Sequence, residues 1–126
     1  MINGKKLIYL GGPYSHPEQV VQNKRYTLYR KIAGIILDKH DSFVFAPITH
    51  SHPIVTHKAF NKALHTYEVW MPLDLAILEI CDELWIAEIN GWEESKGTKL
   101  EIEYARAKGL PIKMITQRGR VYNYEA

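Results

Sequence analysis

Four short apolar segments alternate along the chain with longer segments in which apolar residues recur every three or four positions. The short segments have the length of strands and end near glycine, proline or asparagine: Lys6–Leu10, Phe43–Ala46, Leu84–Ile89 and Leu110–Ile115. Apolar runs of this length, interrupted by few polar residues, are typical of strands that are buried on both faces of a parallel sheet. The pattern predicts an α/β fold with a mainly parallel sheet of four to five strands.

Helical spacing marks the segments between these strands. One helix is predicted from His16-Pro17-Glu18 to Asp38-Lys39, and another from Gly97-Thr98 to Gly109, which can cap its end. Between them, Ala59–Cys81 is expected to be helical in one bent piece or two, with Pro72 at the break. In the second half of that segment, we expect Leu73, Ala76, Ile77 and Ile80 to face the core of the protein.

Composition restricts the class of protein. At 126 residues, 46% hydrophobic and 24% charged, the chain forms one globular domain over residues 1–126. Its formal charge of +2 argues against a nucleic-acid polymer as partner. Cys81 has no partner for an internal disulfide, no apolar run has the length of a membrane span, and no signal-peptide pattern is present, so we expect a cytoplasmic protein that does not bind membranes.

Two glycine-containing turns follow predicted strands, where ligands bind in open α/β sheets. The first reads Gly11-Gly12-Pro13-Tyr14-Ser15, and its glycines allow the backbone to approach a ligand closely. The second is the loop Asn90–Lys96, which leads into Gly97-Thr98 and contains Trp92. Ser95-Lys96-Gly97-Thr98 is either a simple helix entry or an anion-binding nest of free N–H groups and hydroxyls. Trp92 has the pattern of a packing residue, but because it lies in this candidate loop we also expect it among the substrate-binding residues.

The segment Ile48–His57 contains three histidines, His50, His52 and His57, and Pro53 favours an irregular loop over a helix. No cysteine lies nearby, and the acidic residues do not fall at a recognised ligand spacing. We therefore expect a substrate-lining or hydrogen-bonded loop, with His50 next to the substrate, and neither a metal nor a cofactor.

Two carboxylates occupy positions that have both a structural and a functional interpretation. Asp74 is either an exposed first-turn residue after Pro72, favoured by the helix dipole, or a functional acid. Glu101 is either the glutamate of a Thr98-x-x-Glu101 capping box or a reactive group. The residues alone leave both alternatives open.

A joint pattern changes this balance: IYLGGPYS, FAPITH, MPLDLAILEICDELWIA and GTKLEIEYARAKGLPI, in this order. It resembles the nucleoside 2-deoxyribosyltransferase-like superfamily over roughly residues 7 to 115. The resemblance implies a three-layer sandwich of flavodoxin or Rossmann type. It also implies an enzyme with Glu101 as nucleophile, Asp74 as the carboxylate near the leaving base and Tyr9 as the residue that orients the nucleophile.

Within that superfamily, Ser95-Lys96-Gly97 resembles the nucleoside 5′-monophosphate N-glycosidase branch, in which the serine helps to bind a 5′-phosphate. Two departures are Glu94 where transferases often carry an aspartate, and Glu103 in place of a usual glycine. We therefore expect hydrolysis of a (deoxy)nucleoside 5′-monophosphate through a glutamyl glycosyl-enzyme intermediate. Gly11, Gly12, Ser15, Ser95, Gly97 and Arg25 are expected to hold the phosphate, and Tyr14 and Thr98 to lie at the same substrate site.

The alternatives are a deoxyribosyltransferase that acts on free nucleosides and a non-catalytic nucleotide-binding module. Paired carboxylates argue against simple binding, since binding does not require them. The partner is expected to be a small nucleoside or nucleotide and a second copy of the chain in a homodimer or larger homo-oligomer. The tail Gln117–Ala126 is expected to order only against another subunit, because it has little apolar surface of its own.

Overall fold

The sheet of this protein joins strands that are far apart in sequence. The computed structural model describes residues 1–57 and 67–125. Its sheet has the order β2-β1-β3-β4-β5, in which β5 is antiparallel to β4 and the other neighbours are parallel. The strands are β1 Leu7–Gly11, β2 Phe43–Phe45, β3 Glu83–Ala87, β4 Ile112–Ile115 and β5 Val121–Asn123. The predicted α/β fold with a mainly parallel sheet of four to five strands is therefore confirmed.

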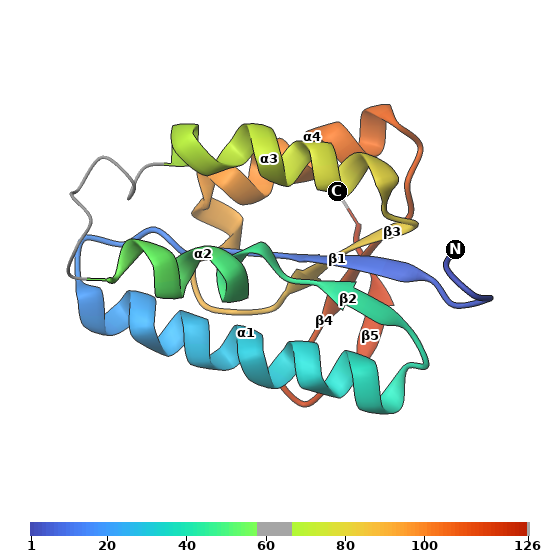
Figure 1. Cartoon of the computed structure of the whole chain (residues 1–126), viewed down its shortest axis with the longest axis horizontal. Helices are drawn as coiled ribbons and strands as arrows, with labels where there is room; N and C mark the ends of the chain where they lie inside the picture. The colour runs from blue at the N-terminus through green and yellow to red at the C-terminus, as the bar shows by residue number, and fades with distance from the viewer. Residues whose placement is uncertain (58–66, 126) are drawn as a thin grey trace.

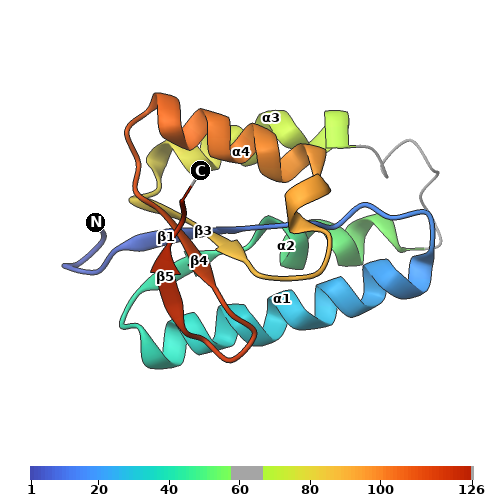
Figure 2. The ribbon, with the colours of Figure 1, turned by 180° about the vertical axis from the view of Figure 1, so that it is seen from behind.

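Helices cover both faces of this sheet (Figures 1 and 2). Helix α1 (Gln19–Lys39) lies on one face, and α3 (Tyr67–Ile80) and α4 (Lys96–Ala107) lie side by side on the other. Alternate strand residues enter the two cores, because successive side chains point to opposite faces. Ile8 and Trp85 pack with α1, whereas Tyr9 and Leu84 pack with α3 and α4. The three-layer arrangement follows from strands that are apolar on both faces.

The prediction of an irregular loop for Ile48–His57 is wrong over most of this segment. Helix α2 spans Pro47–Val55 and contains Pro53. Pro47 at the start needs no N–H partner, and Thr49 donates its hydroxyl to the Ala46 carbonyl. Pro53 removes a single backbone hydrogen bond close to the end of the helix. A proline near a helix end therefore did not prevent the helix.

Helix α3 corrects two further expectations. It continues through Pro72 as one helix, and residues 59–66 of the predicted segment lie outside the described residues. The predicted core face is correct for Ile77, which packs against the core, but wrong for Leu73 and Ile80, which are 44% and 72% exposed, while Leu78 is fully buried. Apolar residues occur on both sides of this helix, so helical spacing could not identify the buried side. No helix among the described residues is long and apolar enough to cross a membrane.

The C-terminal segment folds onto its own sheet, which sequence analysis did not predict. Val121–Asn123 pairs with β4, and Tyr122 and Tyr124 pack against the core under α3 and α4. Main-chain pairing supplies the order that the few apolar side chains of the tail could not. The expectation that this tail orders only against another subunit is therefore wrong.

The strand order places a topological switch point between β1 and β3. These strands are adjacent and parallel, with Tyr9 opposite Leu84 and Gly11 opposite Ile86. The chain leaves β1 toward α1 on one face and leaves β3 through the short 3-10 helix η2 (Trp92–Glu94) toward α4 on the other. Ligands of open α/β sheets bind at such a point, and both glycine-containing turns lie there.

Candidate active site

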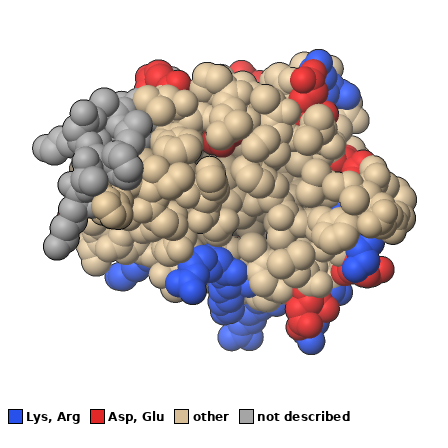
Figure 3. All heavy atoms as spheres, in the orientation of Figure 1, with Lys and Arg blue, Asp and Glu red and all other residues tan. Residues whose placement is uncertain are grey.

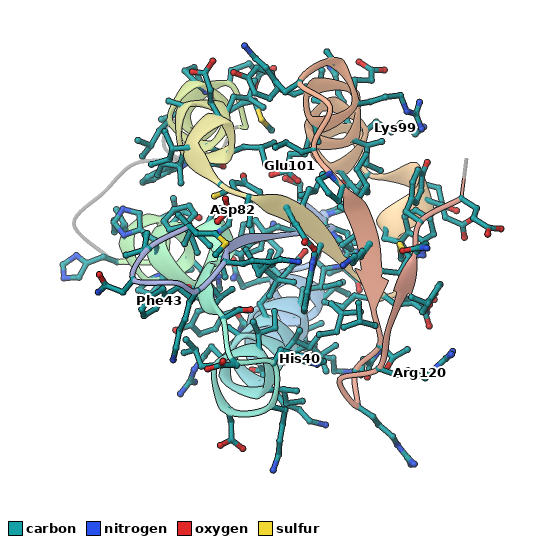
Figure 4. The ribbon with its side chains drawn as sticks, turned by 90° about the vertical axis from the view of Figure 1, so that its right-hand side faces the viewer. His40, Phe43, Asp82, Lys99, Glu101 and Arg120 are labelled. Carbon is teal, nitrogen blue, oxygen red and sulfur yellow. The ribbon has the colours of Figure 1, made fainter. Side chains whose placement is uncertain are left out.

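Glu101 is a charged residue that is only 5% exposed, in a helix whose outer side is polar. Figure 4 shows its side chain extending from α4 toward the sheet. One carboxyl oxygen, Oε2, accepts a hydrogen bond of 2.5 Å from the hydroxyl of Tyr9, which is fully buried in β1. The predicted pairing of Tyr9 with Glu101 is therefore present, although 92 residues separate them in sequence.

Burial controls the protonation of this pair. Burial, followed by the charge of Glu101, raises the pKa of Tyr9 well above 10. The phenol therefore stays protonated and donates a hydrogen bond to Glu101. Burial also raises the pKa of Glu101 from 4.5 to about 8; the Tyr9 hydrogen bond lowers it and the charge of Asp74 raises it. The N-terminus of a helix favours an ionised carboxylate, but Glu101 lies beyond the first turn of α4, where that effect is weak. This carboxyl group therefore holds a proton near neutral pH.

Asp74 lies on α3 and faces the same cavity as Glu101. Helix α3 is already established at Tyr67, so Asp74 is not the exposed first-turn residue of the structural interpretation. It is half-buried, and burial raises its pKa from 3.8 to about 6. The structure thus brings together two carboxyl groups from different helices whose protonation is shifted in the same direction.

The two glycines after β1 are needed for space. A Cβ on Gly11 would lie 2.6 Å from Oε1 of Glu101, the oxygen that Tyr9 does not hold. A Cβ on Gly12, whose φ is +150°, would lie 2.2 Å from the hydroxyl of Tyr29. Both glycines also line the cavity, so the predicted close approach to a ligand and the room for Glu101 depend on the same turn.

Ser95 is the N-cap of α4, and its Oγ accepts a hydrogen bond from the backbone N–H of Thr98. This cap replaces the Thr98-x-x-Glu101 capping box, because Glu101 is bonded to Tyr9 instead. Ser95 and Gly97 also face the cavity, so the serine both caps the helix and can donate its hydroxyl proton to a ligand. Thr98 is fully buried and does not line the cavity.

The cavity has two chemically different sides and a volume of about 230 Å³. This is many times the roughly 30 Å³ of a water molecule, so an organic ligand fits. Its polar side comes from the turn after β1 and the start of α4, including Tyr14, Ser15 and Lys96. Its apolar side comes from α2 and α3 and consists of Pro47, Ile48, Val55, Trp70 and Met71. In Figure 3, few charged side chains surround the depression on the face of the molecule toward the viewer, and atoms of acidic residues are visible at its bottom.

Sequence analysis missed this apolar wall and two polar residues, Ser51 and Lys96. The wall joins α2, which was predicted as a loop, to α3, whose faces could not be ordered from spacing. Lys96 stands inside the Ser95-x-Gly97 pattern, where its position at the helix start was the available signal. Ser51 lies between His50 and His52, and the sequence was interpreted there in terms of metal binding by the histidines.

Three predicted site residues lie elsewhere. His50 is exposed and contacts Trp70 edge to face, with ring centroids 6.1 Å apart, and it does not line the cavity. Trp92 packs against Tyr124 beside the core, as the packing interpretation expected. Arg25 donates to the carbonyls of Ser15 and Asn90, behind the two turns. None of these three residues lines the cavity.

The histidine that the fold connects to the site is His52. Its Nδ1 lies 2.6 Å from the hydroxyl of Tyr14, and its ring stacks on Tyr26 with centroids 4.1 Å apart. Burial lowers the pKa of His52 and raises that of Tyr14 to about 12, so both side chains are neutral. Within residues 1–57 and 67–125, no group of three His, Cys, Asp or Glu side chains is arranged to hold a metal ion.

Comparison with known protein families gives a match over most of the chain. Residues 6–117 match the family described as "Domain of unknown function (DUF1937)". The chain belongs to this family. No curated protein matches it.

Among solved structures, the DUF1937 chain is similar to a 2-deoxyribosyltransferase from the psychrotolerant bacterium Bacillus psychrosaccharolyticus. The TM-score is 0.56 at 20% sequence identity, and the match covers 93% of this chain and 77% of the other. At this identity the similarity establishes the shared fold, which is the fold that the sequence resemblance implied.

Proposed function

We propose that this protein is an N-glycosidase that hydrolyses the bond between base and sugar in a (deoxy)nucleoside 5′-monophosphate. The observation that carries the proposal is the buried Glu101, held through one oxygen by Tyr9, with its other oxygen beside Gly11 in a cavity that also contains Asp74. A carboxyl group raised in pKa by burial is costly for a fold, and such groups are concentrated at reactive sites. The fold shared with a 2-deoxyribosyltransferase supports the same chemical class.

In the first step, a carboxyl proton passes from Asp74 to the departing base, and the bond from base to anomeric carbon breaks. Oε1 of Glu101 then forms an ester with that carbon, after its carboxylate has stabilised the positive charge of the oxocarbenium-like transition state. Tyr9 keeps Oε2 in place and leaves Oε1 as the attacking oxygen. This step needs Glu101 ionised and Asp74 protonated, whereas the higher pKa of Glu101 places the single proton of the pair mainly on Glu101. The reactive form is therefore the singly protonated pair in which that proton has moved from Glu101 to Asp74.

In the second step, water attacks the same carbon of the ester and gives its proton to Asp74. The sugar phosphate leaves with a new hydroxyl group, and Glu101 is released as the carboxylate. Asp74 thereby acts as the acid in the first step and as the base in the second, while Glu101 acts as the nucleophile and then as the leaving group. A transferase differs only in that a second base replaces water.

The division of the cavity orients the substrate. The apolar wall from α2 and α3 suits a flat base, with Asp74 near it, while the polar side suits a sugar phosphate. Ser15, Ser95, Lys96 and the backbone N–H groups at the start of α4 supply donors for the phosphate. The preference for a monophosphate over a nucleoside rests on this polar side.

The competing function is deoxyribosyl transfer between free nucleosides, a reaction of the kind named for the structural neighbour. Values of kcat/KM for a deoxynucleoside and its matched 5′-monophosphate separate the two. We expect the monophosphate to be preferred and Ser95→Ala to reduce this preference. Equal values, or base exchange that outpaces release of free sugar phosphate, would instead assign the protein as a transferase.

A further inference from the structure

One face of α1 carries three side-chain donors that hold the turn after β1. Gln22, Arg25 and Tyr29 are spaced by three and four residues, so they share this face. They donate to the carbonyls of His16 at 2.7 Å, Ser15 at 2.9 Å and Pro13 at 3.0 Å, respectively. The backbone carbonyls of this turn are therefore directed toward α1.

This arrangement determines where the amides of the turn point. In a trans peptide the N–H lies opposite the preceding carbonyl. Because the carbonyls of Pro13 and Ser15 point to α1, the N–H groups of Tyr14 and His16 point away from it. Neither N–H donates to another group among residues 1–57 and 67–125, which leaves both available to an anion.

Among the described residues, the side chain of Arg25 donates a second hydrogen bond, which the side chains of Gln22 and Tyr29 do not. Its Nη2 donates to the carbonyl of Asn90, 3.2 Å away in the loop after β3. The next residue, Gly91, has a φ of +93°, and a Cβ there would lie 2.5 Å from that same Nη2. The rigid guanidinium fork thus connects the turn that carries Ser15 with the loop that leads to Ser95.

We propose that Arg25 is a positioning residue that fixes the spacing of these two loops and thereby sets the preference for a phosphorylated substrate without touching it. The role rests on the proposed function, because Ser15 and Ser95 are the residues expected to hold the phosphate. Arg25 was expected from sequence to contact the phosphate itself. The structure instead uses its donors on two main-chain carbonyls.

The first test compares substitutions of Arg25 in steady-state kinetics. Arg25→Ala should raise KM for a deoxynucleoside monophosphate and lower the monophosphate-to-nucleoside ratio of kcat/KM roughly tenfold. That is about the effect of losing one hydrogen bond between a displaced loop and the charged phosphate. Arg25→Lys should not restore the ratio, because a single ammonium group lacks the rigid fork. Arg30→Ala, an exposed arginine of the same helix, is the matched control and should leave the ratio unchanged. Full restoration by lysine would indicate direct phosphate binding and overturn the proposal.

The second test disturbs the same connection while keeping the charge. Gly91→Ala displaces the guanidinium from Asn90 and should lower the ratio as Arg25→Ala does, with no further loss in the double variant. Gly109→Ala controls for backbone strain, since Gly109 has a φ of +73° with no neighbour within 4 Å of the added Cβ. Additive effects of Gly91→Ala and Arg25→Ala would show that they act separately and would contradict the proposal.

Hydrogen exchange tests the positioning role without any substrate. Arg25→Ala should speed amide exchange in both residues 11–18 and residues 88–96, whereas Arg30→Ala should speed neither. Unchanged exchange in either loop would overturn the positioning role. If exchange changes but no monophosphate is cleaved, the positioning role stands and the proposed function fails.

Discussion

Replacing Glu101 with glutamine should stabilise the protein at alkaline pH, although it should abolish turnover. Glutamine keeps the shape of the side chain and can still accept the Tyr9 hydrogen bond, but it cannot ionise. The native carboxyl group has a pKa of about 8 in the fold against 4.5 as the reference value. Between these values the folded state binds more protons than the unfolded state, so wild-type stability falls as the pH rises.

The window from pH 6 to pH 8 isolates this carboxyl group. Asp74, with a pKa of about 6, is still half protonated in the fold at pH 6, but it is present in both proteins, so its contribution cancels in the difference. Over these two pH units the loss for Glu101 is roughly 2 kcal/mol, because the slope of about 1.4 kcal/mol per unit falls to about half where the folded carboxyl group is half ionised. All histidines are present in both proteins, so any contribution from them cancels in the difference.

The assay is urea unfolding followed by far-UV circular dichroism at pH 6, 7 and 8, with linear extrapolation to water. We expect the stability of Glu101→Gln minus that of the wild type to grow with pH. Glu103→Gln on the exposed side of α4 is the control and should follow the wild type. If the Glu101→Gln and wild-type profiles run parallel, or if Glu101→Gln loses stability relative to the wild type as the pH rises, the carboxyl group is not held in the state described.

Further outcomes follow from the same geometry. The pH profile of kcat/KM should be bell-shaped with limbs near pH 6 and pH 8, since the two carboxyl groups must share one proton; a plateau through pH 9 would exclude this pair. Asp74→Asn should slow substrates with poor leaving bases far more than a nitrophenyl deoxyriboside, and equal slowing would make Asp74 a positioning residue. Gly11→Ala should displace Oε1 and remove activity from a protein whose circular dichroism is native; retained activity would contradict the close approach. Deleting residues 117–126 removes β5 and should lower the melting temperature, whereas an unchanged value would show that β5 contributes nothing.

Sequence reasoning succeeded where local patterns decide the structure. Buried strands are short apolar runs in any α/β fold, so β1, β3 and β4 could be located within a few residues. Glycine turns at their ends indicated the position of the site. Tyr9 and Glu101 could be paired because a resemblance of spaced motifs related them, which no local pattern could do.

The remaining features depend on tertiary context. Pro53 is compatible with a helix because α2 ends two residues later, and no rule of local propensity states where a helix ends. In helix α3, Leu73 is exposed and Leu78 is buried, because the sheet beneath the helix covers only one of its apolar sides. The role of Arg25 depends on two carbonyls, which have no sequence signature at all.

Release of free base from deoxynucleoside 5′-monophosphates, followed by chromatography, tests the central claim most directly. The wild type should release base and sugar phosphate in equal amounts from at least one member of a panel covering the common bases, and Glu101→Gln should release neither. An absence of free base from every monophosphate with wild type, or equal release by the wild type and Glu101→Gln, would contradict the assignment of Glu101 as the nucleophile of an N-glycosidase.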